Sequence, residues 1–578
     1  MSRLASTLAV IWRLASPYFN SEDRLAGRLL LAGVIAIELS LTSINVMLNH
    51  WQNRFYNALQ DRNWDSFVTE LVIFSALVGG YAVLAVYQLY LQQWLQIRCR
   101  IWMTRRYVDH WLIGANHYRM QLLGDAADNP DQRIADDLRL FVEQGLTIGL
   151  RVFGAFISLC SFVLVLWALS NQTPLRLFGY ELAIPGYLVW GALIYAIAGT
   201  TLAHLIGRKL IKLNFRQQRY EADFRFNLVR ARESSEQIAL LRGEAAERQR
   251  LQELFGFIAA NWRLIMARTK PLTLLTESYR QTSSVIPYLL VSPAFFAGQL
   301  QLGGLMQTAQ AFDRVREALS IFVDVYRNLA EWRAVVDRLA GFDAAIAQAQ
   351  VATVPAIEVT ARESEDALTL KDLMVRLPQG APLIAADDIA IRTGERVLIT
   401  GPNGCGKSTL LRAIAAIWPF GHGRITLRKG ASVMILPQRP YFPVATLATA
   451  VTYPAAAGTF SREQLADVIG AVGLPALNRR LEEEAHWNRM LSLGEQQRLG
   501  VARAILQAPD VLILDEATGA LDEPGEAALY RLIGERLPGI TIVSVGHRTA
   551  LRACHGRQLV VARDGEHACL QEREALPA

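Results

Sequence analysis

Cysteine is scarce in this chain, and its cysteines lie far apart. The 578 residues contain five, and none has the spacing of a disulfide framework or of a zinc site. Charged residues are also few, at 19%, while hydrophobic residues make up 52%. This balance suits a membrane domain joined to a soluble domain, and the length requires at least two domains.

The first 24 residues lack the features of a cleaved signal peptide. Arg13 interrupts their apolar run, and no small-residue cleavage site follows. Their apolar residues predict instead an amphipathic helix that lies in the membrane interface. We therefore expect no targeting segment to be removed.

The net charge of +6 does not indicate a nucleic-acid partner. Lys and Arg concentrate in two segments, one after residue 90 and one after residue 204, which lie between apolar stretches. The positive-inside rule places such segments in the cytoplasm, together with both ends of the chain. We expect a lipid bilayer as a partner of this half, and no nucleic acid.

Six segments are expected to cross the bilayer as helices. They cover about residues 27–48, 69–90, 146–170, 181–204, 271–298 and 303–330. The last two contain charged residues, among them Glu277, Arg280 and Asp313. Such charges are tolerated where a helix faces a bundle interior or an aqueous cavity, so we expect these two helices to do so.

The C-terminal part has a different pattern. Short apolar runs alternate with helical stretches, which is typical of a mostly parallel sheet wrapped by helices. We therefore predict a transmembrane domain over residues 1–344, a linker over 345–365 and an α/β domain over 366–578.

The segment 401–408 fits the P-loop pattern. It reads Gly401-Pro402-Asn403-Gly404-Cys405-Gly406-Lys407-Ser408, and Thr409 opens the helix predicted after it. Its glycines let backbone N–H groups cradle phosphates, Lys407 can reach the β- and γ-phosphates, and the Ser408 hydroxyl can ligate Mg²⁺.

Two carboxylates end an apolar run further along the chain. Asp515 follows residues 511–514 and is expected to reach the Mg²⁺ shell, while Glu516 next to it can polarise an attacking water. A purely structural role would explain such a pair if it stood alone. Its place after the P-loop favours catalysis.

With the segment Leu491–Arg498 between them, these motifs resemble only the ATP-binding cassette (ABC) ATPases. The resemblance implies that Gln438 senses the γ-phosphate and contributes to the Mg²⁺ site, and that His547 closes on the γ-phosphate. It also implies that Ser492, Gly494 and Glu495 serve the nucleotide held by another cassette. Because the chain holds one cassette, we expect ATP and Mg²⁺ as cofactors and a homodimer as the working form.

The sequence departs from the family where adenine is usually stacked. An aromatic residue about 25 positions before the P-loop is typical, but residues 373–378 read Leu-Met-Val-Arg-Leu-Pro. Arg376 or an apolar side chain is then expected to replace it, and nucleotide selectivity could be loose.

The membrane half resembles a narrower group, which contains peptide-uptake transporters of the SbmA/BacA type, their ATPase-bearing relatives of the YddA type, and peroxisomal fatty-acyl transporters. The segments that carry this match are Asn49–Leu59, Asn129–Asp136, Glu221–Arg225, Glu236–Ala239, Pro287–Gly298 and Gly303–Phe312. The Trp/Phe/Tyr-rich first segment favours the bacterial branch. Residues 129–136 and 221–236 also fall where exporter-type transporters dock coupling helices into the ATPase.

The expected fold is therefore a membrane α-helical bundle of six transmembrane helices, of the exporter-type ABC fold, fused to an α/β P-loop nucleotide-binding domain. The expected function is ATP-driven transport of a peptide or cobalamin-like solute across the bacterial inner membrane, with the direction open. The alternatives are a fatty-acyl or lipid-conjugate exporter and an ATP-gated regulator. Glu38, Glu277 and Arg280 are candidates for the solute path, although Glu277 and Arg280, spaced i,i+3, are equally consistent with neutralising each other.

Overall fold

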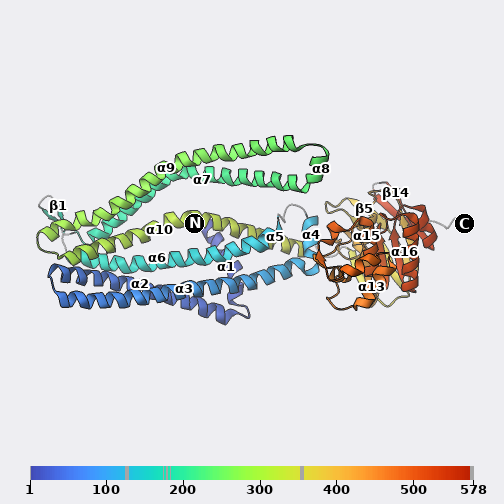
Figure 1. The fold of residues 1–578 in the computed structure, drawn as a ribbon, viewed down its shortest axis with the longest axis horizontal. Helices are drawn as coiled ribbons and strands as arrows, with labels where there is room; N and C mark the ends of the chain where they lie inside the picture. Colours follow the sequence, from blue (N-terminus) through green and yellow to red (C-terminus); the bar gives the residue numbers. More distant parts are fainter. Residues whose placement is uncertain are drawn as a thin grey trace. The chain divides into compact units, whose positions relative to one another are not determined.

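The computed structural model describes residues 2–123, 129–172, 175–177, 180–182, 184–351, 357–565 and 567–572. The chain forms two compact units (Figure 1). One contains residues 1–107 and 130–340, and the other contains residues 108–129 and 341–578. Each unit is described by itself.

The first unit is built from long helices. Its elements are α1 (Ser2–Phe19), α2 (Arg24–Gln60), α3 (Trp64–Leu112), α5 (Pro130–Gln132), the π-helical turn η3 (Arg133–Asp137), α6 (Leu138–Gln172), the hairpin β1 (Leu175–Leu177) and β2 (Tyr180–Leu182), α7 (Tyr187–Glu233), α8 (Ser235–Leu240), α9 (Glu244–Phe296) and α10 (Leu302–Val351). Helices α3 and α10 continue into residues of the second unit.

Four helical segments are long and apolar enough to cross a membrane, among the residues that the structure describes. They are Arg24–Gln60, Trp64–Leu122, Pro130–Gln172 and Tyr187–Glu233, and they match the first four expected spans. Helices α9 and α10 form as well, but they are not among these four segments. The fourth expected span began too early, because Glu181 and Leu182 belong to strand β2 and α7 starts at Tyr187.

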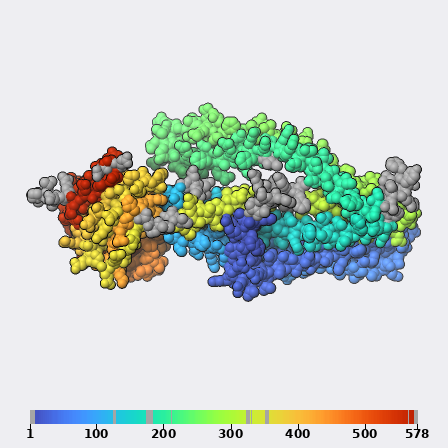
Figure 2. Space-filling model, turned by 180° about the vertical axis from the view of Figure 1, so that it is seen from behind, coloured from blue at the N-terminus to red at the C-terminus, as the bar shows by residue number. Residues whose placement is uncertain are grey.

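Helices α6, α7, α9 and α10 share one apolar cluster within this unit. Phe162, Leu188, Val291 and Phe312 are fully buried in it, one from each helix. Helices α7 and α9 run side by side, as Figure 1 shows. Figure 2 shows α1, in dark blue, at the surface of the same unit.

A polar seam joins α2 to α10. Asn49 donates to the Gln307 carbonyl (3.0 Å) and to Gln310 Oε1 (2.9 Å), and Asn53 donates to Gln307 Oε1 (2.6 Å). The Gly303 amide donates to Asn57 Oδ1 (2.8 Å). Asn49, Asn53 and Asn57 are one turn apart, so they lie on one face of α2. Interhelical amide bonds of this kind hold helices together in membranes.

The second unit contains the ATPase-like domain. Its elements are the 3₁₀ turn η1 (Ile113–Ala115), α4 (Asn116–Leu122), β3 (Ile357–Arg362), β4 (Asp366–Arg376), β5 (Pro382–Ala386), β6 (Ile389–Arg392), β7 (Arg396–Thr400), α11 (Lys407–Ile414), β8 (Gly421–Arg428), β9 (Val433–Leu436), β10 (Ala445–Thr446), α12 (Leu447–Thr452), α13 (Arg462–Ala471), η4 (Pro475–Arg480), β11 (Glu484–Ala485), α14 (Trp487–Met490), α15 (Leu493–Gln507), β12 (Val511–Asp515), α16 (Glu523–Arg536), β13 (Thr541–Val545), η5 (Thr549–Cys554), β14 (Arg557–Asp564) and β15 (His567–Glu572).

The main sheet of this unit has the order β3-β8-β4-β5-β15-β14-β7-β13-β12-β9, and β6 pairs with β4. Strands β14, β7, β13, β12 and β9 run parallel to one another, whereas β14 pairs antiparallel with β15, and β4 pairs antiparallel with β5, β6 and β8. Two buried apolar clusters contain the strand side chains. Leu512 and Ile542 lie in one cluster, and Ile513 and Val543 lie in the other, as the alternation of a strand requires.

Helix α4 belongs to the second unit, where Leu122 packs against the apolar cluster that contains Ile513. Residues 130–137, which include most of the expected coupling segment 129–136, belong to the helical unit, where Asp137 accepts from Arg133 (2.8 Å) and from Arg338 on α10. The coupling role of residues 129–136 stays a prediction.

The range expected as a linker is partly structured. Helix α10 continues to Val351 and β3 begins at Ile357, while residues 352–356 lie outside the described residues.

Candidate nucleotide site

The predicted site residues follow the carboxyl ends of four neighbouring parallel strands. The P-loop follows β7, His547 follows β13, Asp515 ends β12, and Gln438 follows β9. These strands are adjacent in the order β7-β13-β12-β9. Ligands of open α/β sheets bind at this edge, so the topology brings the four motifs together.

The P-loop backbone has the conformation that its glycines allow. Gly406 has φ +93° and directly precedes α11, and a Cβ there would lie 2.8 Å from Leu383. Lys407 is buried, and its ammonium donates to the carbonyls of Gly401 (2.9 Å) and Pro402 (2.7 Å). The α11 amides and this cation therefore meet in one loop, as an anion-binding nest requires.

Ser408 and Asp515 form the second part of the site. The Ser408 hydroxyl donates to Asp515 Oδ1 over 2.9 Å, and burial raises the pKa of the Asp515 carboxyl. The Ser408 hydroxyl and the partly buried Asp515 carboxylate together offer the hard oxygen donors that Mg²⁺ prefers. Within the described residues, no group of three or more His, Cys, Asp or Glu side chains could hold a metal by itself. Mg²⁺ would therefore need phosphate and water ligands as well, which is its usual coordination.

Glu516 lies between Gln438 and His547. Gln438 Nε2 donates to Glu516 Oε2 over 3.2 Å, and His547 Nε2 lies 3.3 Å from Glu516 Oε1. Glu516 has φ +52°, a left-handed conformation that is strained for a residue with a side chain. Such strain clusters at functional sites because the surrounding structure holds it in place.

Gln497 connects these loops, and the sequence analysis gave it no role. Its side chain donates to the Gln438 carbonyl (3.0 Å) and accepts from the Ala520 amide (2.9 Å). It also lies 3.5 Å from the Glu516 carbonyl, and it is buried. The sequence offered one signal for this bridging role, which is that Gln497 lies within the motif 491–498.

Ser492 and Glu495 cap helix α15. Ser492 Oγ accepts from the Glu495 amide (3.3 Å), and Glu495 Oε2 accepts from the Ser492 amide (2.8 Å), which is a capping box. Gly494 follows in the first turn of the helix. Among the described contacts, none joins Ser492 to residues 401–409 of its own chain, so this helix end is free to serve another nucleotide.

The region expected to hold adenine offers two side chains. The Arg376 guanidinium donates to the Gly380 carbonyl over 3.0 Å, and Leu377 is 37% exposed. Arg376 and the apolar Leu377 both stay candidates for the adenine contact predicted from the sequence.

The candidate path residues lie in the helical unit. Glu277 and Arg280 form an ion pair of 2.6 Å, and their side chains are 55% and 66% exposed. Glu38 on α2 accepts from Gln88 on α3, and a Cβ on Gly154 of α6 would collide with it. Glu38 is thus packed among three helices, whereas Glu277 and Arg280 are exposed within the single chain.

Comparison with known proteins gives matches over most of the chain. Residues 14–296 match the family model ABC transporter transmembrane region 2, and residues 386–519 match the family model ABC transporter. The inner membrane ABC transporter ATP-binding protein YddA of Escherichia coli is 33% identical over 93% of this chain and 94% of its own length.

More distant relatives include ABC transporter D family member 2, chloroplastic, of Arabidopsis thaliana. It is 31% identical over 96% of this chain and 87% of its own length. The human lysosomal cobalamin transporter ABCD4 is 25% identical over 96% of this chain and 94% of its own length. A bacterial Atm1-family ABC exporter with ATP bound has a similar fold, with a TM-score of 0.71 at 17% identity over 94% of both chains.

Proposed function

Because this chain belongs to the ABC transporters, as a half-transporter in which a membrane domain and an ATPase domain share one polypeptide, we propose that it works as a homodimer. The family establishes ATP-driven transport and the ATPase activity. The N-terminal end of α15 carries the dimer proposal, because Ser492 and Gly494 there would contact a nucleotide bound to the P-loop of a second chain. Each chain would complete the site of the other in this way, which gives two composite sites.

The site residues then divide the hydrolytic work. Lys407 and the P-loop amides bind the phosphates, including the amide of Thr409 and those of residues 403–406. Ser408 and Asp515, with Gln438, would hold Mg²⁺, which would supply positive charge to neutralise the phosphates. Glu516 polarises the attacking water, and His547 and Gln438 fix the position of its carboxylate.

Helix α8 supports the same assembly. Leu240 and Leu241 at its end are 77% and 81% exposed within the chain. Apolar side chains so exposed at a helix end mark an interaction site, and a second copy of this chain is the partner that the dimer provides. Residues 221–236, which we expected near a coupling contact, lead directly into α8.

We further propose six membrane spans for each chain, with α9 and α10 lining an aqueous path. In this arrangement both chain ends and the ATPase domain lie on the cytoplasmic side of a bacterial inner membrane. The domain limits proposed from the sequence, at residues 344 and 366, are retained. Charged side chains on α9 and α10 support this placement, because lipid would exclude them.

The solute is proposed to be a hydrophilic or amphipathic molecule, such as a peptide or a cobalamin-like compound. One relative is named as a cobalamin transporter. A fatty-acyl or lipid conjugate stays the alternative predicted from the sequence. An ATP-gated regulator is disfavoured, because gating by binding alone does not require Glu516 and His547.

The test is ATPase activity of the full chain in lipid nanodiscs, with peptides, cobalamins and acyl-CoAs as a panel. Stimulation by one class identifies the solute class. Glu516→Gln supplies the background rate. Hydrolysis by the wild type no faster than this background would contradict the proposed function.

A further inference from the structure

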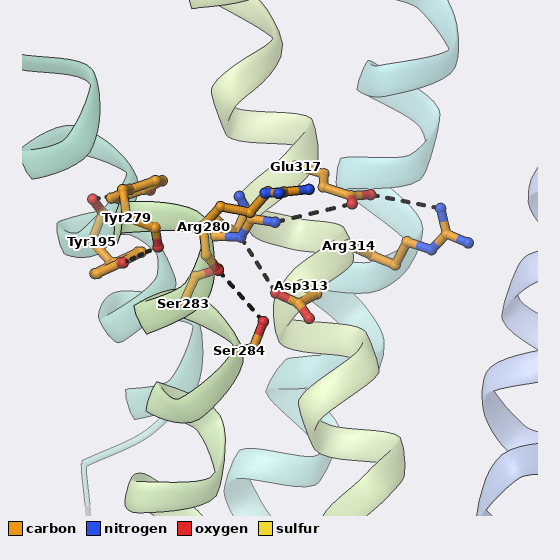
Figure 3. A network of polar contacts seen from close by, with 9 residues as sticks. Tyr195, Tyr279, Arg280, Ser283, Ser284, Asp313, Arg314 and Glu317 are labelled. Carbon is orange, nitrogen blue, oxygen red and sulfur yellow. Dashed lines mark hydrogen bonds and ion pairs between the residues drawn. The ribbon is translucent and has the colours of Figure 1, made fainter. Parts of the chain in front are cut away.

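Three oppositely charged pairs occupy the helices that the proposal places along the solute path. Arg280 pairs with Glu277 on α9 over 2.6 Å. On α10, Arg316 lies 3.3 Å from Asp313, and Arg314 lies 3.7 Å from Glu317. Each pair is spaced i,i+3 on one helix, and the six charges sum to zero. Figure 3 shows most of these side chains close together, with Tyr195 and Tyr279 beside them.

These charges lie at membrane depth. Asp313 is about 16 Å along α10 from Leu302, at 1.5 Å per residue, and the hydrocarbon core is about 30 Å thick. Arg280 is about 24 Å from the end of α9 by the same rise. Ionised groups at this depth avoid lipid by facing water or protein. Glu277, Arg280 and Glu317 are all more than half exposed in the single chain, so they face open space.

A stacked pair of tyrosines, Tyr195 and Tyr279, lies beside this cluster. The Tyr195 and Tyr279 rings stack at 4.3 Å with an interplanar angle of 9°. The Tyr195 hydroxyl donates to the Tyr279 carbonyl (2.6 Å), and the Tyr279 hydroxyl donates to the Tyr195 carbonyl (3.3 Å). This reciprocal contact fixes α7 to α9, and Tyr279 also interacts with Arg316. Arg316 is therefore held in place, with only 12% of its side chain exposed.

The α10 pairs are looser than the α9 pair, and Arg314 is shared. Besides Glu317, Arg314 donates to Asn45 Oδ1 on α2 over 3.3 Å. The contacts of 3.3 and 3.7 Å within the α10 pairs are longer than the 2.6 Å contact within the α9 pair, and they exceed the length of about 2.7–2.9 Å that is typical of strong charge-assisted hydrogen bonds. The α10 groups are therefore the ones that a ligand can engage at the smaller cost.

We infer that Asp313, Arg314, Arg316 and Glu317, beside the Tyr195–Tyr279 stack, form a solute-binding site for molecules that carry both a carboxylate and an ammonium group. Such a solute exchanges partners with the pairs: its carboxylate takes an arginine, and its ammonium takes the carboxylate that the arginine leaves. A solute with only one sign of charge leaves one protein group unpaired at low dielectric, which is costly. Peptides with free termini fit this rule, whereas neutral solutes and polyanions do not.

This inference rests on the proposed function, and the test separates the two. One short peptide of alanine and serine is prepared with free termini, with an acetylated N-terminus, with an amidated C-terminus, and with both ends blocked. Each form is titrated against the ATPase activity of the full chain in nanodiscs. We expect the free form to stimulate at about a tenfold lower concentration than either singly blocked form, because each lost pair is worth about one decade of affinity.

Single-residue variants test which charged side chain binds which end of the peptide. Arg316→Gln should remove the preference for a free carboxylate and keep the preference for a free amine, and Asp313→Asn should do the reverse. Arg219→Gln is the matched control, because Arg219 also pairs with an acidic residue, Asp223, but is 76% exposed and lies further along α7. It should behave as the wild type.

A second measurement guards against variants that fold poorly. A cysteine introduced by Glu277→Cys should react with a water-soluble thiol reagent, and the free peptide should protect it while the doubly blocked peptide does not. Equal stimulation by all four peptide forms, or stimulation by acyl-CoA alone, would overturn this site while ATP-driven transport stands. A wild type that hydrolyses ATP no faster than Glu516→Gln would instead overturn the proposed function.

Discussion

At the scale of single residues, the candidate site depends on contacts between loops that follow different strands. Motif spacing identified Lys407, Ser408, Asp515 and Glu516, because strand ends and P-loop glycines leave a readable pattern. The left-handed backbone of Glu516 and the bridging role of Gln497 depend on loops that meet only in the folded sheet. No local pattern reports such contacts.

Glu516→Gln should bind ATP but hydrolyse it at least about 100-fold more slowly, because removal of a general base costs about 10²–10⁴ in rate. Gln keeps the shape of the side chain, so nucleotide binding should survive. Steady-state phosphate release and equilibrium nucleotide binding measure the two effects. Near-normal turnover would remove Glu516 from the catalytic role.

Asp515→Asn should raise the melting temperature of the nucleotide-free protein and abolish Mg²⁺-dependent hydrolysis. Burial raises the pKa of the Asp515 carboxyl above its unfolded value, so its charge opposes folding above that folded pKa and not below the unfolded pKa. A gain of about 1 kcal/mol would raise the melting temperature by about 2–4 °C in a domain of this size.

The pH dependence checks the cause of this gain. The difference in melting temperature between the Asp515→Asn variant and the wild type should be largest near neutral pH. It should shrink as pH falls through the raised pKa, because the wild-type carboxyl then protonates. A difference that is constant with pH would show that the charge is not responsible.

At the scale of elements, the sequence predicted the four apolar helices and misplaced one boundary. Leu182 and Ile184 lie directly before the apolar start of α7, so hydropathy could not separate strand β2 from α7. The polar seam between α2 and α10 was also not predicted. Its segments were recognised as matching a family, but a pairing over about 250 positions cannot be read from either segment alone.

Gly303→Val should destabilise this seam. A Cβ at Gly303 would lie 1.9 Å from the Asn53 carbonyl oxygen, which is backbone and cannot rotate away. Overpacking of this kind costs about 1–3 kcal/mol, so the melting temperature should fall by several degrees.

Gly79→Val is the matched control for the seam. Gly79 lies inside α3, and a Cβ there would meet nothing within 4 Å. Thermal unfolding in one detergent compares the two variants. Equal melting temperatures for Gly303→Val and Gly79→Val would contradict the close approach of α2 and α10.

At the scale of the whole molecule, the sequence predicted two kinds of domain and their order. The coupling role of residues 129–136 stays a prediction. The ion pair of the adjacent Asp137 with Arg338, about 200 positions away, could not be read from the local sequence. The structure contains one chain, so the proposed homodimer depends on the argument that each ATP site needs residues from two chains.

The composite ATP site is the central claim, and a disulfide across the two chains tests it most directly. Cys405 is a free cysteine in the P-loop, and Ser492→Cys places a second thiol at the α15 end. Mild oxidation of that variant in membranes should give a covalent dimer that loses ATPase activity, and reductant should restore it. Adding Cys405→Ser should abolish the cross-link. If Ser492→Cys gives no dimer, or gives one that persists without Cys405, the two chains do not share their ATP sites and the account is wrong.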